Sequence, residues 1–140
     1  MIGQIREHIK LSIKKCNPDF RPTDKPFFND QDLAGTQIDY TYHVEMSTAL
    51  FELQQLDGVI TNIPVNVKVY RQGGREKNQV FDEGYTQALC IAALIIDNTE
   101  LTSASYIKSV DVESVTPSEV PESEDVYVYE MGFVFKLAYA

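Results

Sequence analysis

The stretch VNVKVYRQGGREKNQVFDEGYTQALCIAALIID (Val65–Asp97) decides the fold. Apolar and polar residues alternate over 65–70, which predicts a strand with one buried face. A Gly-Gly loop follows, and residues 82–97 then predict a helix that begins near Asp82 and is apolar nearly all round. Such a helix must be covered on several sides. A sheet of the same chain can cover one side of the helix, and a neighbouring subunit can cover the remaining sides. We therefore expect copies of this chain to associate with one another.

The C-terminal residues predict a second long strand, over 126–139. Every second side chain from Tyr127 to Tyr139 is a large apolar or aromatic group, so these residues share one face. The other face, which begins with Val126 and Val128, is only partly polar. We therefore expect this strand to be covered on both sides.

The other elements are a helix, a hairpin and a strand. Apolar spacing predicts an amphipathic helix over 2–16, stopped by Asn17-Pro18. Alternation over 38–46 and an Asp57-Gly58 two-residue turn predict one long bent strand over 38–56 that returns over 59–71. Pro64 predicts a bulge or an edge position in the return. The last element is a strand over 106–115.

Two segments are expected to lack regular structure. Residues 17–37 are irregular, and Phe20, Phe27 and Phe28 attach them to the core, unless the Phe27-Phe28 pair is an exposed partner contact. Residues 116–125 are predicted to be an acidic, solvated loop. The order of elements predicts one α+β domain over residues 1–140. Its sheet is mixed and mainly antiparallel, with a long hairpin, and is flanked by an N-terminal helix and a central apolar helix.

The composition restricts the classes of partner. The chain has 140 residues, 44% of them hydrophobic, and its formal net charge is −9. That charge argues against a protein that wraps nucleic acid or binds an anionic membrane surface, although an acidic wall suits DNA that must slide past without sticking. No secretory leader or membrane-length apolar run is evident, so we expect a soluble protein made in a cytosol. Cys16 and Cys90 are expected to be buried free thiols.

Signatures of catalysis and of cofactor binding are weak. Residues 30–41 resemble a calcium loop but lack two ligands, including the bidentate one. His43 and Glu45 share a strand face but lack the partners of a tetrahedral zinc site, so a solvent-facing histidine is expected. Gly73-Gly74 lacks the residues of a phosphate loop, and no nucleophile motif occurs. We expect no enzyme, metal or cofactor.

Two loops of opposite charge are the candidate contact sites. A basic loop carries Arg71, Arg75 and Lys77, and an acidic loop carries Glu119, Glu122 and Glu124. The simpler explanation is that both are solvated linkers. The functional alternative is a head-to-tail contact between the two loops on adjacent copies, which is the type of contact that closes into rings.

The layout as a whole resembles a known family. A helix over 2–16, a long hairpin over 38–71, an apolar helix over 82–97 and two closing strands resemble the tail-terminator, or tail-completion, proteins of long-tailed bacteriophages. The segments closest to family strands are VNVKVY (residues 65–70) and YVYEM (residues 127–131). The resemblance covers most of the chain. It lies in the size, the order of the elements and the general residue pattern.

The resemblance implies a structural virion protein. Family members form rings, typically hexamers, that cap the tail tube and then meet the head-side connector, while DNA passes through the channel without specific binding. The implied partners are therefore like copies, the tail tube protein and a connector or neck protein, with no membrane. The implied location is the virion tail or neck, after assembly in the host cytoplasm. Another neck ring protein, a small non-viral binding module and a small enzyme stay open as alternatives.

Overall fold

A computed structural model describes residues 2–27, 37–47, 50–54, 58–97, 107–121, 123 and 125–139. The fold is α+β, as the sequence predicts. The two α-helices of the described residues are α1 (Ile2–Cys16) and α3 (Lys77–Ile96), with a short 3₁₀ helix η1 (Gly74–Glu76) before α3. The strands are β1 (Arg21–Pro22), β2 (Thr41–Met46), β3 (Leu50–Gln54), β4 (Gly58–Gln72), β5 (Ile107–Glu119) and β6 (Val126–Tyr139).

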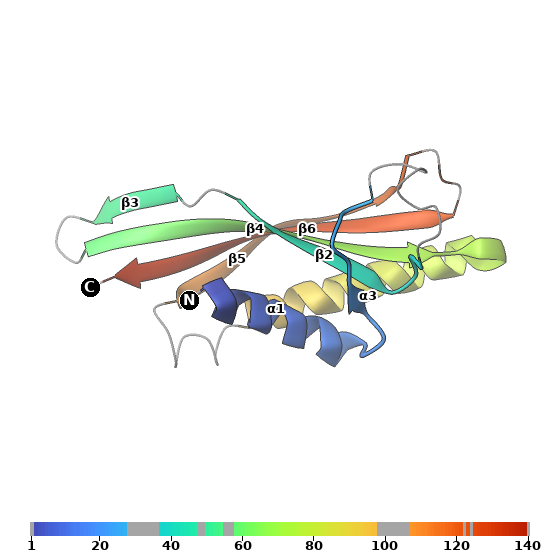
Figure 1. Cartoon of the computed structure of the whole chain (residues 1–140), viewed down its shortest axis with the longest axis horizontal. Helices are drawn as coiled ribbons and strands as arrows, with labels where there is room; N and C mark the ends of the chain where they lie inside the picture. Colours follow the sequence, from blue (N-terminus) through green and yellow to red (C-terminus); the bar gives the residue numbers. More distant parts are fainter. Residues whose placement is uncertain are drawn as a thin grey trace.

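These strands form one sheet in the described part of the chain, with the order β1-β2-β4-β6-β5, and β3 pairs with β4 beyond the end of β2. The β1–β2 pair is parallel and the other pairs are antiparallel. β4 and β6 pair along nearly their whole length, from Val59↔Tyr139 to Gln72↔Val126. At about 3.3 Å per residue, each of these two strands extends for roughly 50 Å. They form the long axis of the molecule in Figure 1.

The alternation of β4 and β6 places their apolar side chains on one face of the sheet. Val65, Val67 and Val69 of β4 lie opposite Phe133, Met131 and Tyr129 of β6, and all six are buried. Fully burying one such aliphatic or aromatic side chain contributes about 1.5–3 kcal/mol. The predicted one-sided strand over 65–70 and the predicted strand over 126–139 are confirmed.

The two helices cover this face side by side and antiparallel (Figure 1). Near one end, His8 Nε2 donates to the carbonyl of Ile95 at 2.8 Å; near the other, Cys16 Sγ donates to the carbonyl of Gln87 at 3.6 Å. α3 contacts β4, β5 and β6. α1 lies beside β1 and β2, with Ile5, Ile9 and Ile13 in the core. The helix predicted over 2–16 and the end of the helix predicted near Asp97 are confirmed.

A smaller cluster covers the opposite face at one end of the sheet. It consists of Phe27, Ile38, Tyr70, Val120, Val126 and Val128. The Phe27 N–H donates to the Tyr70 hydroxyl at 2.9 Å, and the two rings pack edge to face. Because Phe20 and Phe27 are both buried, the prediction that they attach the N-terminal segment to the core is confirmed. Phe28 lies outside the described residues. The expectation that β6 is covered on both faces is confirmed over its first residues.

The long hairpin is confirmed, but its turn is not the predicted one. Gly58 pairs with Gln54 inside the ladder, so the connection comprises residues 55–57 and not Asp57-Gly58. The predicted strand over 38–56 is divided into β2 and β3, which both pair with β4. The break lies opposite Pro64, whose carbonyl accepts a hydrogen bond from Ser47 N at 2.9 Å. Proline lacks the N–H that an unbroken ladder would use, and β4 tolerates it at this gap.

Three predicted boundaries are wrong, each because of tertiary contacts. β2 begins at Thr41 because Asp39 and Tyr40 form a turn, with Tyr40 in the left-handed region (φ 59°). α3 begins at Lys77, five residues before the predicted Asp82, because Phe81 packs on Tyr127 and its carbonyl accepts the Tyr129 hydroxyl at 2.6 Å. β5 continues to Glu119 because it pairs with β6 as far as Tyr127. Residues 116–119 are therefore strand and not loop.

Gly84 permits the close contact between α3 and β6. A Cβ at this position would lie 2.5 Å from the Tyr129 hydroxyl oxygen and 2.7 Å from Cζ of the same ring. Alanine normally stabilises a helix by about 1 kcal/mol relative to glycine. At position 84 the clash outweighs that gain, since the Tyr129 hydroxyl is held by Phe81.

We predict that Gly84→Ala lowers the free energy of unfolding by about 1–3 kcal/mol, measured by chemical denaturation. Gly3→Ala in α1 is the matched control, because no atom lies within 4 Å of the added Cβ. The control should leave stability unchanged or raise it slightly. A Gly84→Ala protein as stable as the wild type would contradict the packing described.

Candidate interaction surfaces

The outer side of α3 is an exposed apolar surface. The buried residues of α3 are Gly84, Ala88, Ile91, Ala92 and Ile95, which share the face toward the sheet. On the flank of this face Leu89 is 51% exposed and Ile96 is 39% exposed, and Cys90 and Ala93 between them in the sequence are also exposed. Leu11 on the outer side of α1 is 47% exposed. The helix is apolar nearly all round only in its second half, because Asp82, Glu83 and Thr86 form an exposed polar surface on its first half.

Arg71 is at the centre of a buried ion-pair network and not on an exposed loop. It is the second-last residue of β4 and is only 3% exposed. Its Nε donates to Asp39 Oδ1 at 2.8 Å and its Nη1 donates to Glu83 Oε1 at 2.9 Å. The same Nη1 donates to the side-chain carbonyl of Gln87. Arg71 thus joins β4, the 39–40 turn and α3, and its burial removes it from the predicted contact surface.

The network also explains the unusual backbone of Tyr40. A left-handed conformation is uncommon for a residue with a large side chain and persists where surrounding contacts determine it. The Arg71 guanidinium lies 3.9 Å from the centre of the Tyr40 ring, and the Tyr40 hydroxyl donates to Glu83 at 3.2 Å. Asp39 Oδ1 accepts a second bond, from Gln72 N. Burial opposes the charge of Arg71, but the hydrogen bonds to Asp39 and Glu83 outweigh it and raise the Arg71 pKa.

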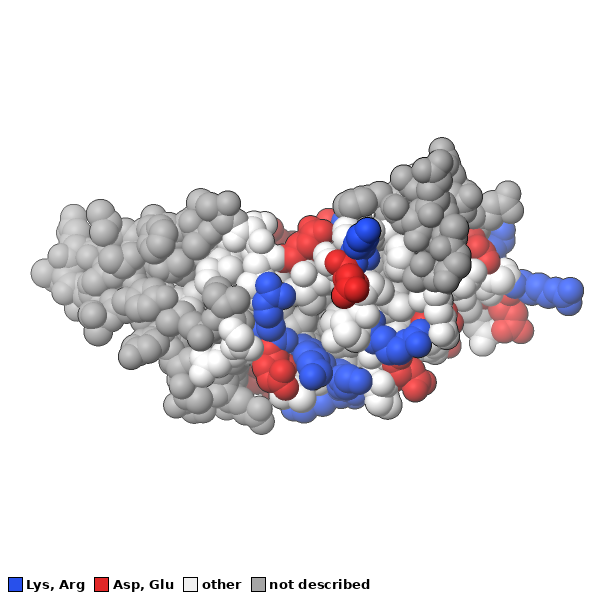
Figure 2. All heavy atoms as spheres, viewed as in Figure 1, with Lys and Arg blue, Asp and Glu red and all other residues white. Residues whose placement is uncertain are grey.

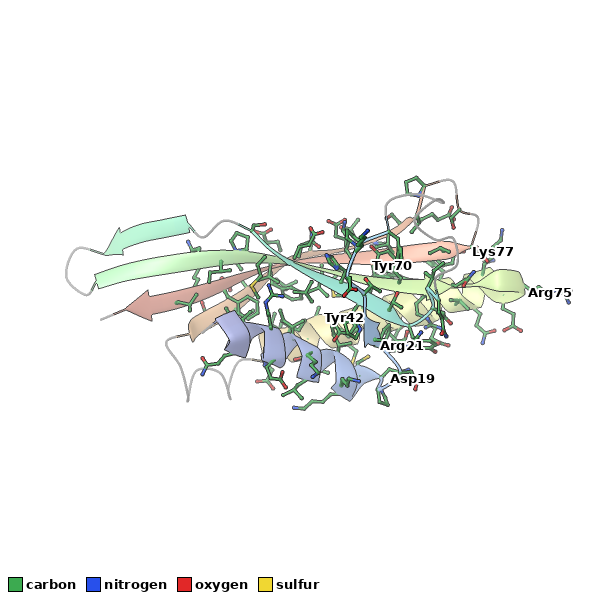
Figure 3. The ribbon with its side chains drawn as sticks, in the orientation of Figure 1. Asp19, Arg21, Tyr42, Tyr70, Arg75 and Lys77 are labelled. Carbon is green, nitrogen blue, oxygen red and sulfur yellow. The ribbon has the colours of Figure 1, made fainter. Side chains whose placement is uncertain are left out.

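Arg75 and Lys77 remain exposed candidates. Both project from η1 and the start of α3 at one tip of the molecule (Figure 3). The segment after β5 reaches the same tip, because Gly73 N donates to the carbonyl of Asp125 at 2.7 Å. Glu119 is exposed at the end of β5, whereas Glu122 and Glu124 lie outside the described residues. The described ends of the two segments, Gly73 and Asp125, are therefore neighbours within one chain.

The two cysteines lie close together. Cys16 is half-buried at the end of α1, and Cys90 is exposed on α3, which makes the prediction of a buried Cys90 wrong. Burial, followed by the hydrogen bond and the charge interaction with the Cys90 thiol, raises the pKa of Cys16 to about 12. The two thiols therefore differ in their chemistry although they are in contact.

A groove of about 400 Å³ lies between α1 and the β1–β2 segment. Its polar lining combines Arg6, Glu7 and Lys10 of α1 with Asp24 and His43. The His43 side chain is 14% exposed, its Nε2 is 3.3 Å from Glu45, and its Nδ1 is within hydrogen-bond distance of the Thr23 carbonyl. The prediction of a solvent-facing histidine is therefore wrong.

Within the described residues, no three His, Cys, Asp or Glu side chains converge on a possible metal position. Most of the suspected calcium loop lies outside those residues, so the structure does not describe it. Among the described helices, none is both long enough and apolar enough to cross a membrane. No protein-family model and no curated protein sequence matches this chain.

We predict that Arg71→Ala lowers the free energy of unfolding by roughly 2–4 kcal/mol, because it removes the buried guanidinium and unpairs two carboxylates. Arg71→Lys keeps the charge but cannot reproduce the planar set of donors, so it should be intermediate. Arg75→Ala is the control and should stay within about 0.5 kcal/mol of wild type. Urea unfolding measures the free energy of unfolding of all three variants. If both Arg71 variants are as stable as the wild type, the network does not stabilise the fold.

We also predict unequal alkylation of the two thiols by N-ethylmaleimide at pH 8. Cys16 is half-buried and that burial raises its pKa, whereas Cys90 is exposed to the reagent, so Cys16 should react several-fold more slowly than Cys90. Peptide mass spectrometry after timed quenching identifies the modified residue. In urea both thiols should react at similar rates. Faster labelling of Cys16 than Cys90 in the folded protein would contradict the geometry.

Proposed function

We propose that this protein is a structural ring component of a long-tailed bacteriophage, a tail terminator that caps the tail tube and joins it to the head-side connector. The proposal adopts the family that the element order resembles. It assigns the chain no catalytic role and no cofactor. Its partners are like copies, the tail tube protein and a connector or neck protein, with DNA passing through the channel.

The observation that carries the proposal is the exposed apolar side of α3. Leu89 and Ile96 lie beside the fully buried Ile91 and Ile95, so the second half of α3 carries large apolar side chains on an exposed flank as well as on its buried face. Exposed apolar surface of this kind is the surface that a contact with another molecule would cover. A subunit of an assembly can expose such a surface when it is alone, because neighbouring subunits cover that surface in the assembly.

The shape of the sheet supports the same proposal. β3, the first half of β4 and the end of β6 extend past both helices as an arm (Figure 1). An arm that neither of the described α-helices covers suits a subunit that reaches over a neighbouring copy or onto a tube. The net charge of −9 suits a channel wall that does not hold DNA, because like charges repel.

Electron microscopy of the purified protein tests the proposal. Negative-stain images should show closed rings, either of the protein alone or after addition of tail tubes, whose open ends it should cap. A neck ring of another layer would bind the connector and leave the tubes uncapped. A single compact species at all concentrations that is inert toward tubes and connectors would instead indicate a monomeric binding module and would refute the proposal.

Substitution of the exposed apolar residues should separate assembly from folding. We predict that Leu89→Glu with Ile96→Glu keeps the wild-type circular dichroism spectrum and a thermal midpoint within a few degrees, since both side chains are exposed, yet abolishes tube capping or ring formation. Ile91→Glu is the control and should unfold the protein, because it buries an unpaired charge. Full capping by the folded double variant would show that the outer side of α3 is not covered in the assembly.

A further inference from the structure

Basic and acidic residues are unevenly distributed between the N-terminal segment and the rest of the chain. Residues 1–27 carry six basic and three acidic side chains, whereas the remaining residues carry six basic and eighteen acidic ones. The basic residues of the first segment are all exposed; they are Arg6, Lys10, Lys14, Lys15, Arg21 and Lys25. Figure 2 shows Lys and Arg gathered over α1. A basic surface therefore exists on a protein whose other residues are strongly acidic.

The topology places this basic segment at one edge of the sheet. β1 is the terminal strand on that side, and α1 lies next to it, since the groove between them has walls from Lys10 of α1 and from Pro22 and Tyr42 of the strands. Arg21 lies in β1 itself, just after α1 ends (Figure 3). We call α1 together with residues 19–25 the basic edge.

The opposite edge of the sheet is acidic. β5 is the terminal strand there, and its exposed charged side chains are Asp111, Glu113 and Glu119. β5 also contains Lys108, whose side chain lies outside the described part of the structure, and Nζ of Lys136 in β6 is 3.8 Å from Asp111 Oδ2. Glu113 lies over Gly132 of β6. We call β5 the acidic edge.

The acidic edge is poorly suited to accepting a further strand. Its pairing with β6 is irregular between Ile107 and Ser109 and again between Val112 and Ser114, and it contains Pro117. Bulges, proline and charged side chains are the features by which proteins prevent edge-to-edge strand addition. A partner of this edge is therefore recognised through side chains, and a cationic surface is the complementary one.

We propose that the basic edge of one copy docks against the acidic edge of the next copy, and that this contact closes the ring. The inference rests on the proposed function. Two different edges of the same chain meet in this contact, so it is heterologous, and a heterologous contact with a closing rotation produces a ring. The charge of the whole chain does not pull copies together, because a net charge of −9 repels, whereas this orientation brings opposite charges into contact.

A charge-exchange experiment tests the docking. One variant carries Lys10→Glu and Lys14→Glu, and a second carries Asp111→Lys and Glu113→Lys. Each alone would place like charges in every contact and should lose its rings in negative stain and gel filtration. A mixture of the two restores opposite charges in every contact and should form rings of alternating subunits. All four residues are exposed, so circular dichroism should show that both variants are folded.

Arg75→Glu with Lys77→Glu is the matched control for the Lys10 and Lys14 variant. It makes the same change in net charge, but at the η1 tip of the molecule and not at the basic edge. It should keep its rings at low salt. Wild-type rings should dissociate more readily at 0.5 M than at 0.05 M sodium chloride, since salt screens exposed charges. If a double variant is unfolded, a single change replaces it in the same mixing test: Lys14→Glu for the basic edge and Glu113→Lys for the acidic edge.

Two results would overturn the docking while the proposed function stands: rings formed by each variant alone, or no rings from the mixture of folded variants when wild type forms them. Loss of rings in the Arg75 and Lys77 control alone would relocate the contact to the η1 tip and would also overturn it. Absence of rings and of tube capping in the wild type would instead refute the proposed function itself. The two failures are thus distinguishable.

Discussion

The pairing of β4 with β6 is the constraint on which the rest of the structure depends. These two strands run antiparallel over nearly their whole length, and their matched alternation produces a continuous apolar face from Val69 and Tyr129 to Ile63 and Phe135. A change of register by one residue would move every one of these side chains to the other face, so the burial itself fixes the register. The helices then have one surface on which to pack, and Gly84 lets α3 approach it closely.

Polar contacts complete the arrangement at one end of the sheet. Arg71 follows Val69 on the helix-covered face of β4, where another apolar residue would extend the core. Its guanidinium instead binds Asp39 and Glu83, which belong to two segments that the β4–β6 pairing does not position. A buried charge that is paired and hydrogen-bonded fixes geometry more than it adds stability. Arg71 therefore determines where the 39–40 turn and the first half of α3 lie relative to the sheet.

The sequence predicted the elements whose pattern is local and missed those that depend on distant partners. Alternation over 65–70 and 126–139 was enough for β4 and β6, and apolar spacing was enough for α1. The early start of α3 could not be predicted, because residues 77–79 (KNQ) are polar and the helix is held there by Phe81, which packs against the tyrosines of β6. Pro117 indicated a loop, yet pairing with β6 keeps it in an edge strand. Arg71 looked like part of a basic loop because its partners, Asp39 and Glu83, are 32 and 12 residues away.

The same division applies to the candidate surfaces. The apolar character of α3 was visible in the sequence, but which side is exposed depends on the position of the sheet. The basic character of residues 6–25 was not singled out from the sequence, and its significance appears only when the topology places β1 and β5 at opposite edges. β4 has partners on both sides and cannot accept another strand, and irregular pairing protects β5. In the proposed ring, copies associate through side chains, apolar on α3 and charged at the two edges. Apolar contact provides affinity without a preferred direction, whereas opposite charges at opposite edges define which edge meets which, and that direction is what a closed ring requires.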